Sequence, residues 1–273
     1  MIVTRVLPAL LLCVVAAACG EGGETSSGGE TTTVSPSATP TRPSIDERCS
    51  SEELRAAAPT EVSFEASDGT ELFAVELGDG PRGLVLLHTT MSTALCGWTP
   101  AMTWLADAGF HVLAMDSRCS GYSGCETGKG FDLDLIAATE ELRSRGAETV
   151  IAVGGSRGGS VTLATAARPD HDLDAVVDLS GGWPHEYYTG PSPSDDPAVL
   201  AKRIDVPVLG AAARDDLGMN LEEHRAVHHA IAAEDKEYVL LKEGGHAMIM
   251  LGLDEPSAFY RGDFMTFLEK HSR

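Results

Sequence analysis

The stretch Val150–Thr165, VIAVGGSRGGSVTLAT, decides the fold of this chain. A β-branched run leads into a cluster of glycines, and an alanine-rich segment with helix-forming character follows. The chain is therefore expected to turn sharply from a strand into a helix at Ser156. Such a turn can hold a phosphate, simply redirect the chain, or present a nucleophile.

The spacing of the glycines separates these three readings. A dinucleotide-binding fingerprint needs Gly-x-Gly-x-x-Gly, but Ser156 stands two positions after Gly154, and a P-loop needs a lysine that is missing here. The sequence instead fits Gly-x-Ser-x-Gly, from Gly154 to Gly158, at a strand-to-helix junction. In such an elbow the serine backbone is strained, and glycines on either side prevent collisions with the neighbouring strand and helix. The stretch therefore predicts a nucleophilic serine.

Strand and helix patterns alternate along the chain from about residue 60 onward. Two alternating segments, 61–67 and 70–77, flank Asp68-Gly69, which is a hairpin signal. Six further strand patterns follow, at 83–88, 110–116, 149–153, 173–180, 206–213 and 236–241, and helix patterns stand between and after them. The alternation predicts an α/β fold with a mostly parallel sheet of eight strands, opened by an antiparallel hairpin and covered by helices on both faces.

A nucleophilic serine needs two partners, and the sequence supplies both. An imidazole must accept the hydroxyl proton, and a carboxylate must fix the tautomer of that imidazole. The segment VPVLGAAARDDLGMN places Asp215 and Asp216 directly after a strand pattern. The segment YVLLKEGGHAMIM places His246 after the next one. The order is therefore serine, aspartate, histidine.

From about Thr60 to its end, the chain resembles the α/β-hydrolases. The resemblance rests on VLLH before the first crossover, LADAGFHVLAMDSRCSGYSG with its Asp-x-Arg loop, the serine elbow, the aspartate loop and the Gly-His pair. It implies Ser156 as nucleophile, His246 as general base and acid, and Asp216 as the orienting acid, because the family's acid usually stands three residues after the small residue that closes the strand. Asp215 is the second candidate for the acid, and Asp178 is a third.

The resemblance also implies an oxyanion hole made of two backbone N–H groups. One belongs to Arg157, directly after the nucleophile, and the other to Thr90, with Thr89 as the next choice. The family commonly has His-Gly where this chain has His88-Thr89, so the loop that carries the second donor departs from the pattern. His88 is expected to hydrogen-bond this loop rather than to take part in the chemistry.

The segment that follows the strand pattern at 173–180 is expected to line the substrate pocket. Its candidate pocket residues are Trp183, His185 and Tyr187, which lie at the sheet edge where the family binds substrate. Between Ser180 and Val206 the chain has room for a loop and one helix. A minimal cap, or none, is therefore expected over the site.

The protein is expected to work without a metal ion or an organic cofactor. His224, His228 and His229 stand beside two glutamates at helical spacing, which is a pattern that metal sites also use. The favoured interpretation of these histidines is a solvent-exposed helix face.

The amino-terminal region predicts export and anchoring. Residues 1–18 have the short apolar run of a signal peptide, and the AAAC that ends at Cys19 resembles the lipobox of bacterial lipoproteins. Residues 19–48 are then expected to be a lipidated, disordered tether, because their Gly, Ser, Thr and Pro composition cannot bury a core. Residues 49–273 are expected to form the hydrolase domain. The predicted location is the outer side of the bacterial cell membrane, with secretion as the alternative.

Four cysteines remain once the signal and the lipidated residue are set aside. Cys49, Cys96, Cys119 and Cys125 form an even set, which predicts two disulfides in an oxidising compartment. The short spacing of Cys119 and Cys125 favours a local bridge, with Cys49–Cys96 as its companion, although the two other pairings stay open.

Charge and motifs together lead to a functional expectation. A formal net charge of -21 and a pI near 4.6 argue against nucleic acid or anionic lipid as the main partner. The expected activity is cleavage of a small-molecule or polymeric carboxylic ester by a monomeric enzyme through an acyl-enzyme intermediate. A peptidase or acyltransferase with the same triad is the nearest alternative. A surface binding protein that keeps the fold without catalysis is another.

Overall fold

A computed structural model describes residues 42–273, apart from residues 92, 128, 183–196 and 252–257. The side chains of residues 258–261 also lie outside the described part. The expected signal peptide, Cys19 and most of the expected tether lie outside the described residues. Within the described part, no helix is both long enough and apolar enough to span a membrane.

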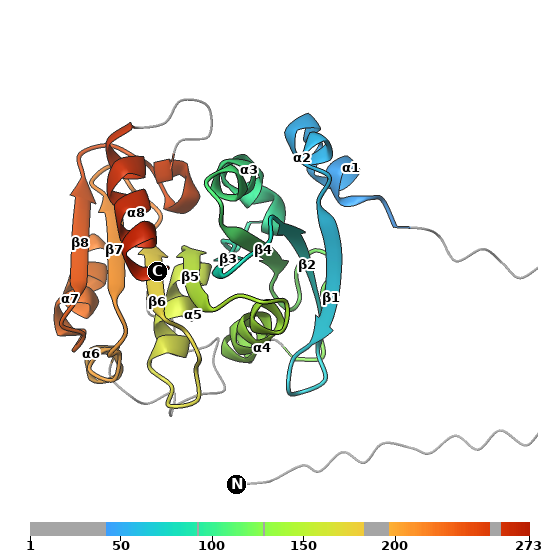
Figure 1. Cartoon of the computed structure of the whole chain (residues 1–273). Coiled ribbons are helices and arrows are strands. Elements are labelled where there is room, and N and C mark those ends of the chain that lie inside the picture. The colour runs from blue at the N-terminus through green and yellow to red at the C-terminus, as the bar shows by residue number, and fades with distance from the viewer. Residues whose placement is uncertain (1–41, 92, 128, 183–196, 252–257) are drawn as a thin grey trace, which may run out of the picture. The chain divides into compact units, whose positions relative to one another are not determined.

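The eight strands form one sheet in the order β1-β2-β4-β3-β5-β6-β7-β8 (Figure 1). Strand β2 runs antiparallel to both of its neighbours, β1 and β4, and every other neighbouring pair is parallel. The prediction of a mostly parallel sheet opened by an antiparallel hairpin is confirmed. The strands are β1 (Thr60–Glu65), β2 (Glu71–Leu77), β3 (Arg82–Leu87), β4 (His111–Asp116), β5 (Thr149–Gly155), β6 (Ala175–Leu179), β7 (Val208–Ala213) and β8 (Lys236–Leu241).

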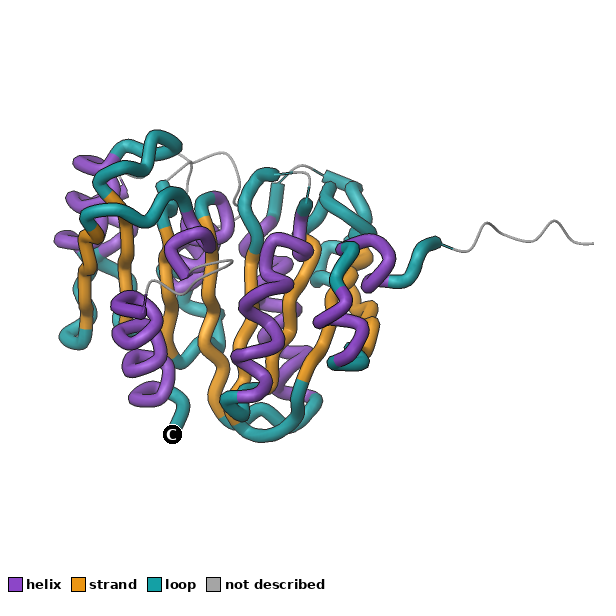
Figure 2. Tube along the Cα trace, turned by 90° about the horizontal axis from the view of Figure 1, so that it is seen from above, coloured by secondary structure: helices purple, strands orange, loops and turns teal. Residues whose placement is uncertain are grey.

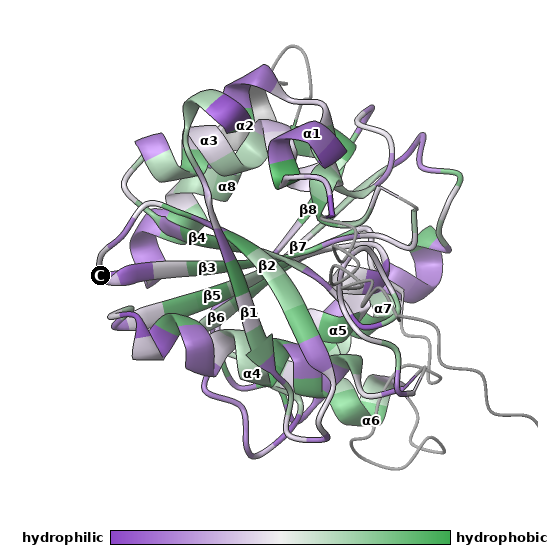
Figure 3. Ribbon diagram, turned by 90° about the vertical axis from the view of Figure 1, so that its right-hand side faces the viewer, coloured by the Kyte–Doolittle hydropathy of each residue, from purple (hydrophilic) through white to green (hydrophobic). Residues whose placement is uncertain are grey.

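Helices cover both faces of this sheet, as the alternating patterns predict. Helices α1, α2, α3 and α8 lie on one side, and α4, α5, α6 and α7 lie on the other (Figure 3). Seen from above, the strands run side by side with helices in front of and behind them (Figure 2). The helices are α1 (Ile45–Cys49), α2 (Glu52–Ala56), α3 (Thr99–Asp107), α4 (Phe131–Ser144), α5 (Arg157–Ala166), α6 (Pro197–Ala201), α7 (Leu221–Ala230) and α8 (Ala258–His271).

Continuous apolar runs in the central strands follow from this two-sided burial. In β3, Leu84 and Leu86 pack in the core beneath α3 and α8, whereas Val85 and Leu87 pack in the core beneath α4 and α5. Successive side chains of a strand point to opposite faces, so a strand buried on both faces must be apolar at every position. Each core is built from alternate residues of the same strands.

The folded region begins earlier than residue 49, because α1 lies inside the segment expected to be a tether. The backbone N–H of Ser44 donates to the Glu47 carboxylate at 3.1 Å, and the side chain of Ile45 is buried. Arg48 forms a two-pronged ion pair with buried Asp116, at 2.6 and 2.9 Å. These contacts explain the order of a short, polar segment that composition alone assigns to a linker.

The structure contains the disulfides Cys49–Cys96 and Cys119–Cys125, which is the pairing that the spacing favours. The first joins the end of α1 to the 3-10 helix η1 (Ala94–Trp98) across a separation of 47 residues. A cross-link of that span stabilises a fold by about 4 kcal/mol in the chain-entropy account. Cys119 has a φ of 58°, in the left-handed region that favours glycine.

Candidate active site

The loops that leave the parallel strands at their carboxyl ends gather at one edge of the sheet. In open α/β sheets this is the edge where ligands bind. Ser156 lies there, between β5 and α5, with a φ of 54° and a ψ of -117°. Its backbone N–H donates to the carbonyl of Leu179 at 2.8 Å, which ties the turn to the neighbouring strand. The structure therefore has the strained strand-to-helix turn that the sequence predicts at this serine.

Glycines make this turn possible because backbone atoms fill the space that side chains would need. A Cβ on Gly154 would lie 2.1 Å from the carbonyl carbon and oxygen of Gly158. A Cβ on Gly158 would lie 2.4 Å from the carbonyl oxygen of Leu87 in β3. Neither obstacle is a flexible side chain, so the elbow requires glycine at both positions.

A Gly154→Ala substitution is expected to destabilise the folded protein by about 1–3 kcal/mol, because the added methyl group forces the backbone at the elbow to shift. Gly262→Ala is the matched control, since nothing lies within 4 Å of a Cβ at this position in α8. The control is expected to be neutral or slightly stabilising, because alanine is the better helix former. Urea unfolding of both variants measures the difference. Equal midpoints would contradict the steric account.

His246 and Asp216 lie in hydrogen-bonding contact. Nδ1 of His246 lies 2.9 Å from Oδ2 and 3.0 Å from Oδ1 of Asp216. The Asp216 side chain is fully buried, whereas that of His246 is partly exposed. The backbone N–H of Gly218 also donates to Asp216 Oδ1, at 2.8 Å. An imidazole that donates from Nδ1 to a carboxylate keeps Nε2 available as a proton acceptor.

Asp215 has a different set of contacts. Its Oδ1 accepts hydrogen bonds from the backbone N–H groups of Gly244 and Gly245, at 3.0 and 3.1 Å. These glycines lead directly into His246, so Asp215 braces the loop that carries the histidine. Of the two adjacent aspartates, Asp216 is the one that contacts the imidazole.

The 3-10 helix η3 (Ala247–Leu251), which directly follows His246, packs against the elbow. A Cβ on Gly155 would lie 2.6 Å from the sulfur of Met248 and 3.1 Å from the Cβ of Ala247, so these two residues cover the position next to Ser156. The backbone N–H of Ala247 donates to Ser180 Oγ at 3.1 Å, which fixes the start of η3 to the end of β6. The serine elbow and the Asp216–His246 pair therefore belong to one region of the sheet edge.

A cavity of about 360 Å³ opens beside Ser156. Both residues expected to form the oxyanion hole, Arg157 and Thr90, are in its wall. Gly218 is also in the wall, and a Cβ on Gly218 would lie 3.0 Å from Nδ1 of His246. The lining residues are Thr90, Ser156, Arg157, Ser160, Ser180, Gly182, Gly218, Met219, Asn220, Glu223 and His224.

The His88-Thr89 departure from the family pattern is accommodated by hydrogen bonds within the loop. The Thr89 hydroxyl accepts the backbone N–H of Met91 at 3.1 Å. His88 accepts the backbone N–H of Ser117 on Nε2 at 3.1 Å, so its Nδ1 is the nitrogen that donates to the Thr89 carbonyl. Burial and the nearby Arg157 cation lower the pKa of His88 to about 4, so this histidine is neutral near pH 7. These contacts match the structural role expected for His88.

The histidines of α7 contradict the sequence-based interpretation. His229 is exposed, but His224 is only 2% exposed and His228 only 4%, so a solvent-exposed face is wrong for both. His224 and His228 complete a buried stripe with Val227 and Ile231 at the spacing i, i+3, i+4 and i+7. The sequence contains this spacing, but two of its four positions are histidines. It therefore lacks the run of apolar residues that predicts a buried helix face.

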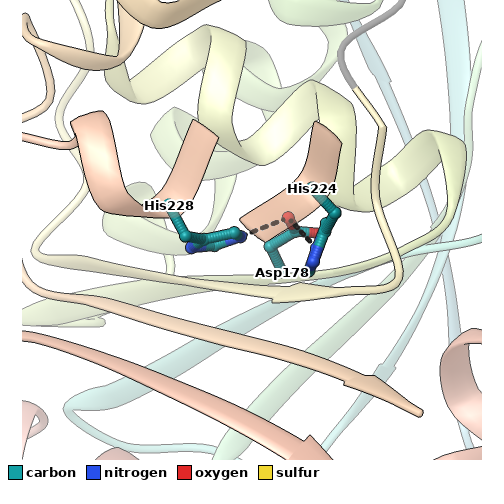
Figure 4. Close-up of side chains that lie close together, drawn as sticks. All are labelled: Asp178, His224 and His228. Carbon is teal, nitrogen blue, oxygen red and sulfur yellow. Dashed lines mark hydrogen bonds and ion pairs between the residues drawn. The ribbon is translucent and has the colours of Figure 1, made fainter. Parts of the chain in front are cut away.

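Both buried imidazoles point to one carboxylate at the end of β6 (Figure 4). Nε2 of His224 lies 3.0 Å, and Nε2 of His228 lies 2.8 Å, from Oδ2 of Asp178. Asp178 is fully buried, and burial alone would raise its pKa, but the two imidazoles outweigh that effect and hold the pKa below its usual range. Asp178 therefore contacts His224 and His228, whereas the contact with His246 belongs to Asp216.

The predicted substrate-pocket residues Trp183, His185 and Tyr187 lie outside the described residues. Most of the segment between Ser180 and Val206, over which a minimal cap or none is expected, also lies outside the described residues. Helix α6 is described within it. The pocket assignment stays a prediction.

Solved structures of other proteins share this fold at low sequence identity. An esterase of Pyrococcus furiosus, Pf2001, is similar with a TM-score of 0.68 at 17% identity, over 85% of this chain and 96% of that one. An acetyl xylan esterase from Paenibacillus sp. R4 has a TM-score of 0.59 at 18% identity, over 77% and 83%. An acylaminoacyl peptidase of Pyrococcus horikoshii has a TM-score of 0.61 at 19% identity, over 78% of this chain and 41% of that one.

These likenesses bear on the fold. No known protein-family profile matches the chain, and no curated protein matches it in sequence. The sheet order, the antiparallel β2 and the helices on both faces agree with the α/β-hydrolase fold of the solved structures. The chain has the α/β-hydrolase fold, as its sequence resemblance implies.

Proposed function

We propose that this protein is a serine hydrolase that cleaves carboxylic esters through an acyl-enzyme intermediate. The observation that carries the proposal is the combination of Ser156 on a strained elbow with a hydrogen-bonded Asp216–His246 pair at the same edge of the sheet. The esterases and the peptidase among the structural neighbours support a hydrolytic reaction.

In the proposed mechanism, His246 Nε2 accepts the hydroxyl proton as Ser156 Oγ attacks the carbonyl carbon of the ester. The tetrahedral intermediate collapses, the proton passes from His246 to the departing alkoxide, and the acyl group stays on Ser156. A water molecule then attacks the acyl-enzyme while His246 again accepts the proton. The second tetrahedral intermediate collapses with cleavage of the Ser156–acyl bond, the proton returns from His246 to Ser156 Oγ, and the carboxylic acid is released. Asp216 holds the imidazole in the required tautomer and stabilises its charged form.

The backbone N–H groups of Arg157 and Thr90 are the proposed oxyanion donors. Arg157 begins α5, so its N–H is at the positive end of the helix dipole. Thr90 follows β3 and lines the cavity beside Ser156. Donors fixed by the backbone stabilise a developing oxyanion without reorganisation during the reaction.

Apolar side chains support an apolar acyl group as the substrate class. Four large apolar residues are strongly exposed within the described part of the chain, and three of them stand close in sequence to proposed site residues. Met91 follows Thr90, Leu217 follows Asp216, and Ile249 lies shortly after His246, with exposed fractions of 63%, 98% and 53%. Exposed apolar side chains can mark a ligand-binding surface, so their places near Thr90, Asp216 and His246 in the chain support an apolar acyl group.

The proposal includes a location outside the cytoplasm, with a lipid anchor at Cys19. This part rests on the sequence of residues 1–19. The disulfides Cys49–Cys96 and Cys119–Cys125 are compatible with an oxidising compartment.

Hydrolysis of matched p-nitrophenyl esters and p-nitroanilides by the purified protein tests the proposed reaction and substrate class. Esters are expected to be cleaved at least about 100-fold faster than amides of the same acid. Values of kcat/KM are expected to rise from acetyl to hexanoyl esters, because each buried methylene contributes about 0.8 kcal/mol. Faster amide cleavage would identify a peptidase instead, and a folded protein that cleaves neither substrate would contradict a hydrolase.

A further inference from the structure

The buried cluster of Asp178, His224 and His228 is separate from the proposed Asp216–His246 pair and has no role in the mechanism above. Its three donor atoms, one carboxylate oxygen and two imidazole nitrogens, lie within 4.8 Å of one another. We propose that these three residues form a binding site for a divalent transition metal ion, with Zn²⁺ as the metal.

The donor set matches the coordination chemistry of zinc. Two imidazole nitrogens and one carboxylate oxygen are ligands that Zn²⁺ accepts at about 2.0–2.2 Å, with a fourth position left for water. His224 and His228 stand at i and i+4 on α7, which brings both rings to one face of the helix. Asp178 meets them from the end of β6, so a metal ion would join the helix to the sheet.

Two of the three donor separations need only a small adjustment to hold an ion. Tetrahedral coordination needs about 3.3 Å between neighbouring donor atoms. The nitrogen-to-oxygen separations in the cluster are 3.0 and 2.8 Å, so the imidazoles must move outward by a few tenths of an ångström. The same separations also suit direct hydrogen bonds, and the experiment below distinguishes a metal site from a hydrogen-bonded cluster.

A supporting shell already orients these donors. Nδ1 of His224 lies 3.1 Å from the Tyr238 hydroxyl, and the backbone N–H of Gly181 donates to Asp178 Oδ1 at 2.8 Å. Partners of this kind fix ligand orientation in metal sites, where the second imidazole nitrogen and the second carboxylate oxygen are hydrogen-bonded. Asp178 Oδ2 is the oxygen that faces the two imidazoles, and it is the one proposed to bind the ion.

Three glycines keep the space around the cluster clear. A Cβ on Gly159 or Gly181 would lie 2.0 or 2.2 Å from Asp178 Oδ1, and a Cβ on Gly210 would lie 2.3 Å from the His228 ring. The strand β7 and the elbow helix α5 therefore both leave room for these side chains. The absence of side chains at these three glycines therefore leaves the space that Asp178 and His228 occupy.

One residue of the cluster reaches the cavity beside Ser156. His224 lines the cavity that also contains Ser156, so one side of the cluster faces that opening. Asp178 is fully buried, and within the described residues its ion-pair partners are the two imidazoles. A buried carboxylate of this kind is stabilised by a bound cation.

Zinc titration of the full-length protein, made without a polyhistidine tag, tests the site. The protein is stripped with EDTA and titrated with Zn²⁺ against a chromophoric chelator, and the bound metal is counted by mass spectrometry after dialysis. One Zn²⁺ per chain is expected, with binding weakened at least about 100-fold by His228→Gln or His224→Ala. His229→Ala, on the exposed side of the same helix, is the matched control and is expected to bind like the wild type.

The Ser156→Ala variant separates this site from the proposed function, because it is expected to bind zinc unchanged even though it removes the proposed nucleophile. A d–d absorption spectrum of bound Co²⁺ that His228→Gln abolishes would give independent support. A folded wild-type protein that binds less than one Zn²⁺ per chain under these conditions would overturn the proposal. Stoichiometric binding that survives both His224→Ala and His228→Gln would overturn it as well, and the wild-type measurement does not depend on whether the variants fold.

Discussion

Replacing Ser156 with alanine is expected to lower kcat for ester hydrolysis by about 10⁶-fold, to a residual rate supplied by binding and the oxyanion donors. The reason is that the substitution removes the oxygen that forms the acyl-enzyme, and His246 then has no hydroxyl to deprotonate. Initial rates on the best ester of the acyl series measure the loss.

Ser160→Ala is the matched control for this prediction. Ser160 lines the same cavity, and its hydroxyl donates to the Ser156 carbonyl at 3.3 Å from within α5. Its loss is expected to reduce kcat by less than about tenfold, because this hydroxyl is not the proposed attacking group. Circular dichroism establishes that both variants are folded. A folded Ser156→Ala variant that keeps more than about one per cent of the wild-type kcat would contradict the role of Ser156 as the nucleophile.

Asp216→Asn is expected to lower kcat by about 10⁴-fold. Asp216 accepts the Nδ1 proton of His246 at 2.9 Å, and a neutral amide both favours the wrong imidazole tautomer and fails to stabilise the imidazolium. The loss should appear mainly in kcat, because Asp216 does not reach the cavity wall in which the substrate is expected to bind.

Asp215→Asn is the control for the same chemical change at the adjacent position. Asparagine keeps a carbonyl oxygen that can accept the hydrogen bonds of Gly244 and Gly245, so the loop is expected to hold and kcat to fall by less than about tenfold. If Asp215→Asn were the more damaging of the two variants, the role of orienting acid would pass to Asp215.

The parts of the fold that the sequence predicts are those in which local pattern and tertiary structure agree. The hairpin around Asp68-Gly69 and the apolar central strands were predictable because a turn signal, alternation and two-sided burial each leave a direct trace in the sequence. The elbow at Ser156 was predictable because backbone crowding restricts Gly154 and Gly158 to glycine.

The parts that the sequence does not predict depend on contacts between distant residues. Helix α1 is short and polar, and its order depends on the Arg48–Asp116 ion pair, which has no local signature in the sequence. The choice between Asp215 and Asp216 depends on which carboxylate turns toward a loop 30 residues later in the chain.

The histidines of α7 show the same limit in another form. Polar residues at helical spacing usually face water, and only the position of Asp178 at the end of β6 explains why His224 and His228 face the interior. The sequence contains all three residues, but their meeting depends on how α7 packs against the sheet.

The most direct test of the central claim is to react the purified protein with a fluorophosphonate probe and to locate the adduct by peptide mass spectrometry. Such probes phosphonylate a serine only when a neighbouring base has activated it. The expected result is one adduct per chain, on the peptide that contains Ser156, and no adduct on the folded Ser156→Ala variant. A folded wild-type protein that stays unlabelled, or an adduct on another residue that persists in Ser156→Ala, would contradict Ser156 as the activated nucleophile of this protein.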